Sequence, residues 1–127
     1  MTDDANEGLL KIKVQVLLGR AIAIGPGKAA LLDAIARTGS IAAAGRELGF
    51  SYRRTRDMIE TLNASWRVPI VEGIRGGAQG GGATLTEAGR TLLKSYRTLD
   101  VAVQSAAQNH ADDLMSLLGP WADSNEQ

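Results

Sequence analysis

Cysteine is absent from the 127 residues, and histidine occurs only once. Without thiols the chain forms no disulfide and no thiolate metal site, and we expect it in the reducing cytoplasm. A transition-metal site would depend on carboxylates, which suit only hard cations, so we expect neither a metal nor another cofactor. His110 has no serine or carboxylate partner at a spacing typical of catalysis. We therefore expect no enzymatic activity.

The chain also lacks a long apolar run. No segment approaches the ~20 residues that cross a bilayer, and the start, Met1 to Asp4, has neither the basic nor the apolar region of a signal peptide. We expect a protein that is neither secreted nor embedded in a membrane. Its 44% hydrophobic and 22% charged residues are typical of a globular domain of this length.

The formal net charge is also zero, but the charged residues are unevenly distributed along the chain. Residues 25–97 carry eleven Lys and Arg against six Asp and Glu, whereas residues 98–127 carry five acids and no base. Such asymmetry concentrates positive potential on one part of the fold and indicates a polyanionic partner. Scattered, solvated charges are the alternative interpretation.

Periodicity predicts a strand pair near the start of the chain. From Leu10 to Val16 apolar and polar residues alternate, which is typical of a strand with one buried face. Gly19-Arg20 is a turn signal, and Ala21–Ile24 is the expected return strand.

Three helices are predicted after the break at residues 25–27. The first ends at Thr38 with Gly39 as its cap, the second begins at Ser40, and the third begins at Ser51. One stripe of the third helix is apolar or small and should face the core: Thr55, Met58, Ile59, Leu62 and Trp66. The tight turn at residues 48–51 predicts a helix-turn-helix, with a plain helical hairpin as the alternative.

A winged arrangement follows. Two short strands, Val68–Val71 and Ala83–Leu85, enclose five glycines in residues 75–82, the pattern of a long hairpin loop. A last helix begins after Thr86, and its apolar residues recur at spacings of four and three. We expect this seam to pack against a second copy of the chain through Leu92, Tyr96, Leu99, Val103 and Ala106.

These elements define the expected architecture. The fold class is α+β, mainly α: a winged helix-turn-helix with an N-terminal β-strand pair and a long C-terminal dimerisation helix. We expect a flexible N-terminus, a DNA-binding domain, a dimerisation helix and a flexible tail at residues 1–8, 9–100, 86–118 and 119–127 respectively.

The third helix carries three arginines on its first turns. At about 100° per residue, Arg53 points away from the buried stripe, and Arg54 and Arg56 lie to either side. The arginine fork matches guanine O6 and N7, and the first turns of a recognition helix enter the major groove. We expect double-stranded DNA to be contacted by Ser40, Ser51, Tyr52, Arg53, Arg54, Arg56, Arg75, Gln79 and Thr86. Pairing of the arginines with Asp57 and Glu60 is the alternative.

Several motifs occur together in a familiar order. They are Thr38–Ala44, Gly49–Arg54, Met58–Asn63, Pro69–Glu72, Gly76–Gly82 and Leu85–Arg90. Over roughly residues 10–100 the chain resembles the N-terminal DNA-binding domain of ModE-type molybdate-responsive transcriptional regulators, which is similar to the LysR-type winged helix. The resemblance implies a dimeric cytoplasmic transcription factor. Its third helix, Ser51–Asn63, would lie in the major groove, with the glycine-rich wing on the backbone or minor groove.

The chain departs from that family in two respects. Full-length members add C-terminal oxyanion-binding domains, and this chain ends at Gln127, so we do not expect an oxyanion effector to bind it. Thr55-Arg56 stand where the family has Ala-Trp, which should change base preference and salt dependence. One alternative function is a module that heterodimerises with a full-length regulator. A weaker one is oxyanion capture by the glycine loop.

Overall fold

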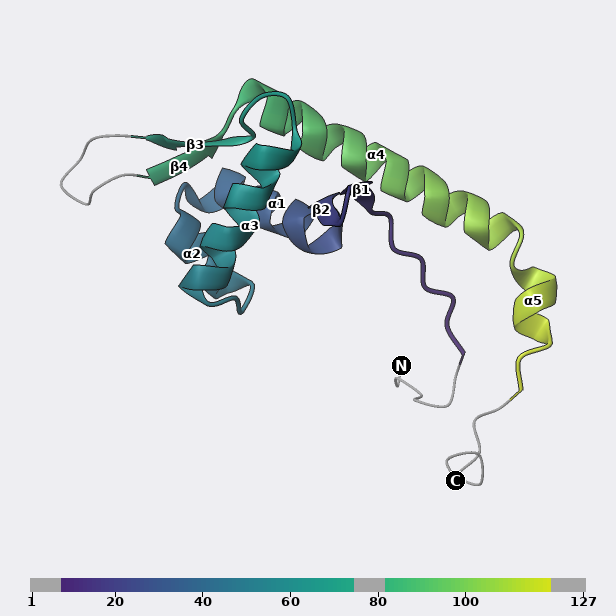
Figure 1. The fold of residues 1–127 in the computed structure, drawn as a ribbon. Coiled ribbons are helices and arrows are strands. Elements are labelled where there is room, and N and C mark those ends of the chain that lie inside the picture. The colour runs from purple at the N-terminus through teal and green to yellow at the C-terminus, as the bar shows by residue number, and fades with distance from the viewer. Residues whose placement is uncertain (1–7, 75–81, 120–127) are drawn as a thin grey trace.

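A computed structural model describes residues 8–74 and 82–119 (Figure 1). The chain order is β1 Val16–Leu18, β2 Ala21–Ile24, α1 Pro26–Thr38, α2 Ile41–Glu47, α3 Tyr52–Ser65, β3 Val71–Ile74, β4 Gly82–Leu85, α4 Glu87–Asn109 and α5 Asp112–Ser116. Strands β1 and β2 form one antiparallel pair, and β3 and β4 form another. The predicted α+β, mainly helical class is confirmed. None of the described helices is long and apolar enough to cross a membrane.

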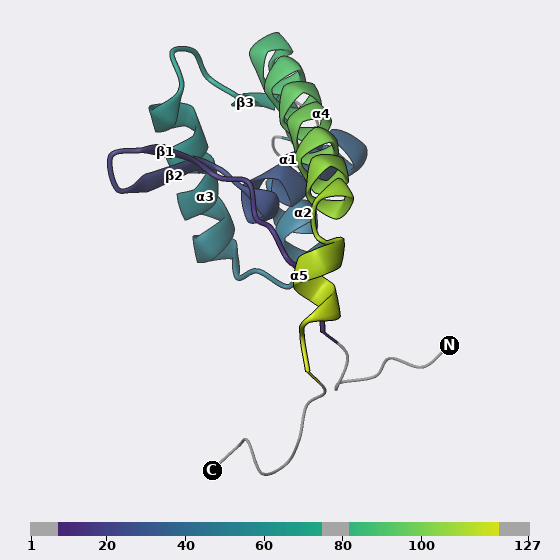
Figure 2. The same cartoon turned by 90° about the vertical axis from the view of Figure 1, so that its right-hand side faces the viewer.

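The core lies between α1, α3 and the first half of α4. Leu31, Leu32 and Ile35 of α1 are almost fully buried and meet Leu62 of α3 in one cluster, together with Leu93 of α4. The predicted apolar stripe of α3 is confirmed, because its members are buried or pack against this cluster. The remainder of α4 extends beyond the compact part, and α5 lies at its far end (Figures 1 and 2).

Capping residues place the helix boundaries where the sequence predicted them. Gly39 ends α1 in the left-handed conformation with φ 71°, a region that glycine adopts without a steric penalty. The side-chain oxygens of Ser40, Ser51 and Thr86 each accept a backbone N–H at the start of α2, α3 and α4. These local bonds define the two helices of the helix-turn-helix and the start of α4.

Helices α2 and α3 approach each other most closely at Gly45 and Thr55. Thr55 is fully buried, and its hydroxyl donates to the Ser51 carbonyl at 2.8 Å. A Cβ atom at position 45 would overlap that hydroxyl. The Gly45 carbonyl also accepts the Phe50 N–H at 2.8 Å. Glycine at this position therefore sets how the two helices cross.

Asn63 fastens the wing to α3. Its side-chain oxygen accepts the N–H groups of Ile70 and Val71 at 2.7 and 3.0 Å, and its amide donates to the Val71 carbonyl at 3.0 Å. Strand β3 begins at Val71 rather than at Val68 as predicted, because its pairing with β4 starts at Val71 and Leu85. The partner strand β4 agrees with the prediction to within one residue.

The first strand was predicted from Leu10, but most of this segment does not pair with another strand, although its side chains alternate between half-buried and exposed as expected. Ladder pairing begins only at Val16, whereas Ile12 and Val14 are half-buried between exposed lysines. The Ile12 carbonyl accepts from Gln104 at 3.0 Å and the Val14 carbonyl accepts from Tyr96 at 2.9 Å. The period of two thus reflects an extended segment lying on α4 rather than a strand in a sheet.

The long C-terminal helix differs from its predicted form. It stops at Asn109, and a separate short helix, α5, follows the break at His110. Tyr96, predicted on the seam between two copies, is instead 7% exposed in the core of its own chain. Burial raises the pKa of its hydroxyl, with a smaller contribution from the charge of Asp100. Tyr96 therefore serves intramolecular packing.

We predict that Gly45→Ala destabilises the protein although alanine is the better helix former. The added methyl group must displace Thr55, and such overpacking costs about 1–3 kcal/mol. Urea unfolding followed by circular dichroism measures the change. Gly27→Ala is the matched control, because a Cβ there would meet only Met58 at 3.7 Å. A Gly45→Ala variant as stable as the wild type would contradict this account of the crossing.

We also predict that Asn63→Ala loosens the wing. The substitution leaves two backbone N–H groups without their acceptor, at a cost of about 1–3 kcal/mol. Asn63→Asp keeps an acceptor but loses the donor to Val71, so its loss should be smaller. Hydrogen exchange of the Ile70 and Val71 amides measures this loosening, and the free energy of global unfolding is measured for comparison. Unchanged exchange at both amides in Asn63→Ala would show that Asn63 does not hold the wing.

Candidate nucleic-acid interface

Three arginines stand exposed on the first two turns of α3. Arg53, Arg54 and Arg56 are all solvent-exposed. In residues 8–74 and 82–119, the ion pairs join Arg37 to Asp33, Arg37 to Glu47 and Arg97 to Asp33. Neither Asp57 nor Glu60 takes part, so the alternative in which these acids pair with the α3 arginines is not what the described residues show.

Arg54 lies over the turn between α2 and α3. Its guanidinium lies over the Phe50 ring, 4.5 Å from the ring centroid, a cation–π contact that orients it. Lys28, in the first turn of α1, is close enough that the charge of Arg54 adds to burial in lowering the pKa of Lys28. The charges of two cations from separate helices thus influence each other on one side of α3. The sequence reasoning missed Lys28, because spacing along one helix says nothing about a neighbour on another.

Arg56 is directed towards the wing. It donates to the Tyr52 hydroxyl at 3.5 Å, and this interaction raises the pKa of Arg56 above its ordinary value. Tyr52 itself is 57% exposed. Both residues line an open groove of about 570 Å³ between α3 and β3. Glu60 and Glu72 line the same groove, so its charge is mixed rather than uniformly positive.

The three predicted hydroxyl residues have structural bonds. Ser40 Oγ accepts the Ala43 N–H and Ser51 Oγ accepts the Arg54 N–H, both at 3.0 Å. Thr86 Oγ1 accepts the Gly89 N–H and donates to the Pro69 carbonyl at 2.7 Å. The Thr86 hydroxyl is therefore occupied within the protein, whereas no bond donated by Ser51 occurs among the described residues. Arg75 and Gln79 lie outside the described residues.

Ion pairs elsewhere engage one arginine of α1 and one of α4. Asp33 joins Arg37 to Arg97, and Arg37 also reaches Glu47 on α2. Hydrogen bonding to Arg97 holds the pKa of Asp33 below its ordinary value, and hydrogen bonding to Arg37 does the same for Glu47. These exposed pairs tie α1, α2 and α4 together. None of these ion pairs involves the α3 arginines, so those cations stay available to a partner.

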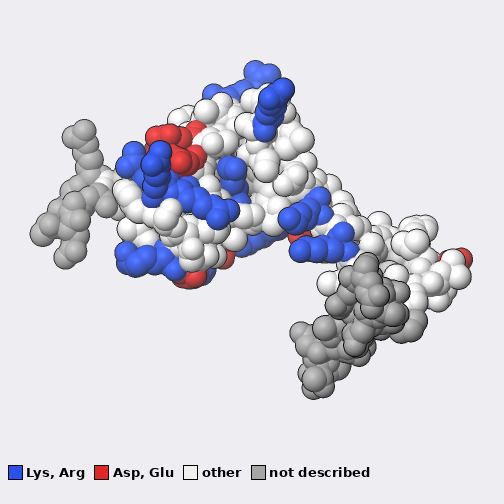
Figure 3. Space-filling model, turned by 60° about the horizontal axis from the view of Figure 1, so that its bottom comes forward, with Lys and Arg blue, Asp and Glu red and all other residues white. Residues whose placement is uncertain are grey.

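The surface reflects this division of charge. Figure 3 shows Lys and Arg side chains gathered over the compact end of the molecule, whereas the end that carries α5 shows none on that face. A polyanion would therefore meet the helix-turn-helix rather than the far end of α4.

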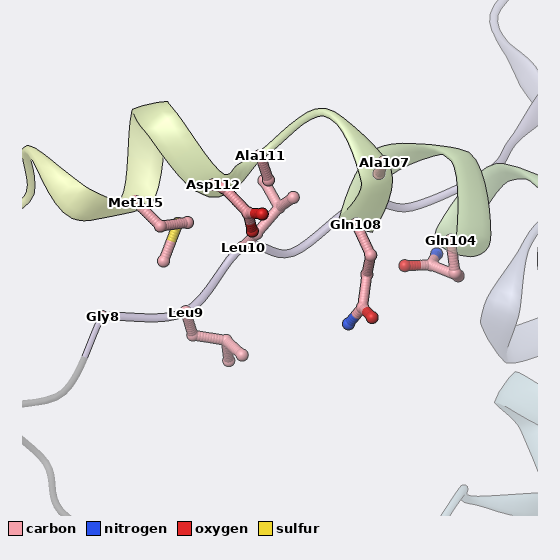
Figure 4. Close-up of a pocket in the computed structure, with 9 residues that line it drawn as sticks. All are labelled: Gly8, Leu9, Leu10, Gln104, Ala107, Gln108, Ala111, Asp112 and Met115. Atoms are coloured by element: carbon pink, nitrogen blue, oxygen red, sulfur yellow. The ribbon is translucent and has the colours of Figure 1, made fainter.

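A hollow at that far end has a different character. It encloses about 360 Å³ where residues 8–10 pass the junction of α4 and α5 (Figure 4). Two glutamine amides and the Asp112 carboxylate supply its polar side chains. Among the described residues, no group of three acidic or histidine side chains is close enough to hold a metal ion.

One face of α4 remains open to a partner. Leu99 is 46% exposed, Val103 is half-buried and Ala106 is exposed. Leu92, from the predicted seam, packs against the core of its own chain and is only half-buried. Four of the five seam residues thus keep some exposed surface, and Tyr96 does not.

Comparison with known proteins places this geometry in context. The family described as bacterial regulatory helix-turn-helix protein, lysR family, matches residues 28–90. Over 68% of its length the chain resembles the crystal structure of a CbnR DNA-binding domain in complex with DNA, with a TM-score of 0.52, 26% identity and 95% of that chain covered. The match spans α1 to the start of α4, which contains the whole helix-turn-helix and wing.

Two curated relatives extend the comparison to longer proteins. The chain is 43% identical to the molybdenum-pterin-binding protein MopA of Rhodobacter capsulatus over 65% of its length and 31% of that protein. It is 35% identical to the transcriptional regulator ModE of Yersinia pestis over 87% of its length and 41% of that protein. The chain therefore spans less than half of these relatives. Residues 28–90 are thus similar to LysR-type regulatory helix-turn-helix domains, and the chain is similar to the corresponding part of the ModE and Mop proteins.

Proposed function

We propose that this chain binds double-stranded DNA as a transcriptional regulator, with α3 in the major groove. The observation that carries the proposal is the exposed row of Arg53, Arg54 and Arg56, without an acidic partner in residues 8–74 and 82–119. Guanidinium groups on the first turns of such a helix reach guanine edges and phosphates. The likeness to a DNA-bound CbnR domain supports the same docking mode.

The three arginines have different surroundings and take different roles. Arg53 points away from the core and reads base edges. Arg54, with Lys28 beside it, and Arg56, with Tyr52 beside it, flank the helix and contact the two phosphate backbones. Ser40 and Ser51 add phosphate contacts at the helix starts. Arg75 and Gln79 complete the set of proposed contacts, whereas Thr86 positions the start of α4 because its hydroxyl is already bonded within the protein.

The regulator acts as a homodimer in this proposal. The open face of α4, with Leu99 and Val103, packs against the same face of a second copy. A two-fold pair of α3 helices then fits two half-sites about one turn of DNA apart. Residues 9–100 form the DNA-binding unit, and residues 86–118 provide the contact between copies.

The regulated process is linked to molybdenum. This part of the proposal rests on the names of the relatives, which include a molybdenum transport protein from Azotobacter vinelandii at 39% identity. The chain works in the cytoplasm, where bacterial DNA is, and it is not an enzyme. The family that matches it is one of regulators.

We predict that the double substitution Arg53→Ala and Arg56→Ala abolishes sequence preference. Each lost bidentate contact costs about 1–3 kcal/mol, and each lost phosphate contact lowers the salt slope by about one. Fluorescence anisotropy with a selected duplex, at two salt concentrations, measures both quantities.

The double substitution Lys11→Ala and Arg20→Ala is the matched control, because both residues are exposed and their replacement removes the same two charges outside the helix-turn-helix. If wild-type protein bound no selected duplex better than random DNA, the proposed function would be wrong. An unaltered affinity in the double variant would exclude α3 as the reading helix.

We predict that Leu99→Glu converts the dimer to a monomer. A carboxylate on the open face of α4 would be buried against its symmetry mate, whereas the monomer fold tolerates it because Leu99 is already 46% exposed. Light scattering after gel filtration gives the mass. Val101→Glu is the matched control, because Val101 is 68% exposed and lies on nearly the opposite side of α4. A Leu99→Glu protein that remains dimeric would show that another surface joins the copies.

A further inference from the structure

The outward ridge of α3 carries a carboxylate as well as an arginine. Thr55 marks the centre of the buried stripe, and at about 100° per residue Arg53 and Asp57 lie about 160° from it on either side. They are therefore the two residues of the first turns that point most directly away from the core. Both are exposed, and side chains four residues apart on a helix are neighbours at about 6 Å.

The Asp57 side chain has no structural role in the described part of the chain. No hydrogen bond or ion pair in residues 8–74 and 82–119 involves its side chain. The acids of α1 and α2 behave differently, since Asp33 and Glu47 both pair with arginines. Its charge acts on Arg56 less than the Tyr52 hydroxyl does. Its carboxylate oxygens are free for a ligand that donates hydrogen bonds.

A carboxylate in this place is costly on DNA unless a base satisfies it. Phosphates repel it, and so do the acceptors that guanine and thymine present in the major groove. Only the amino groups of cytosine and adenine donate there. At adenine the neighbouring N7 is an acceptor that opposes the second carboxylate oxygen, whereas cytosine has no acceptor on that edge. Cytosine is therefore the base that fits.

We propose that Asp57 is a specificity-determining residue that accepts a hydrogen bond from cytosine N4. The inference rests on the proposed function, because it needs α3 in the major groove. Arg53 reads a guanine within about two base-pair steps, since the ~6 Å between the side chains spans about two rises of 3.4 Å. The pair Arg53 and Asp57 thus selects a G and C combination in each half-site. Asp57 also lowers affinity for every other sequence by repelling phosphate.

The substitution Asp57→Asn gives the sharpest test, because asparagine pairs with adenine N6 and N7. Selection from a random duplex library should yield one cytosine column per half-site for the wild type, an adenine column for Asp57→Asn, and no preference there for Asp57→Ala. In competition with the selected duplex, replacing the cytosine should weaken wild-type binding by about five- to tenfold and Asp57→Ala by less than twofold. Non-specific affinity should rise in both variants.

Asp113→Asn is the matched control, since it makes the same charge change on exposed α5, and its selected sequence should equal that of the wild type. Thermal unfolding of each variant verifies that the fold is kept. If the wild type selects a sequence and both Asp57→Asn and Asp57→Ala select that wild-type sequence, the role of Asp57 is refuted while the proposed function stands. A wild type that selects nothing refutes both.

Discussion

The close approach of α2 and α3 at Gly45 and Thr55 is the constraint on which the interface depends. Because position 45 has no side chain, the Thr55 side chain packs directly against α2 and is buried completely, which sets the rotation of α3 about its axis. That rotation alone decides which arginines face outward. A helix rotated by one residue would turn Arg54 or Arg56 towards the core and would bring a different pair of side chains to the ridge.

Charge is divided between holding the fold together and meeting a partner. The exposed pairs among Asp33, Arg37, Glu47 and Arg97 join three helices, and each contributes little by itself to stability because water screens it. Their greater effect is to neutralise Asp33 and Glu47, so that these acids do not compete for the α3 arginines. The positive potential on the compact end then comes from side chains that remain free to move towards phosphate.

Helix α4 contacts both its own chain and, in our proposal, a second copy. One side holds the N-terminal segment through Tyr96 and Gln104, which donate to the carbonyls of Val14 and Ile12. Leu99 lies one turn after Tyr96 on an adjoining part of the same face and stays exposed. An extended segment and a partner packed side by side on α4 would make the direction of this helix rigid. The separation of two recognition helices would depend on that rigidity.

Local signals in the sequence determined the fold. The caps Ser40, Ser51 and Thr86, the left-handed Gly39 and the helical stripe of α3 act within a few residues, so their spacing suffices to predict the helix-turn-helix. Only tertiary structure decided that Asn63 holds the wing, that Lys28 adjoins Arg54 and that residues 10–15 lie on α4. It also decided that Tyr96 turns inward. These contacts join residues distant in the chain, and no periodicity along one element encodes which neighbour it will meet.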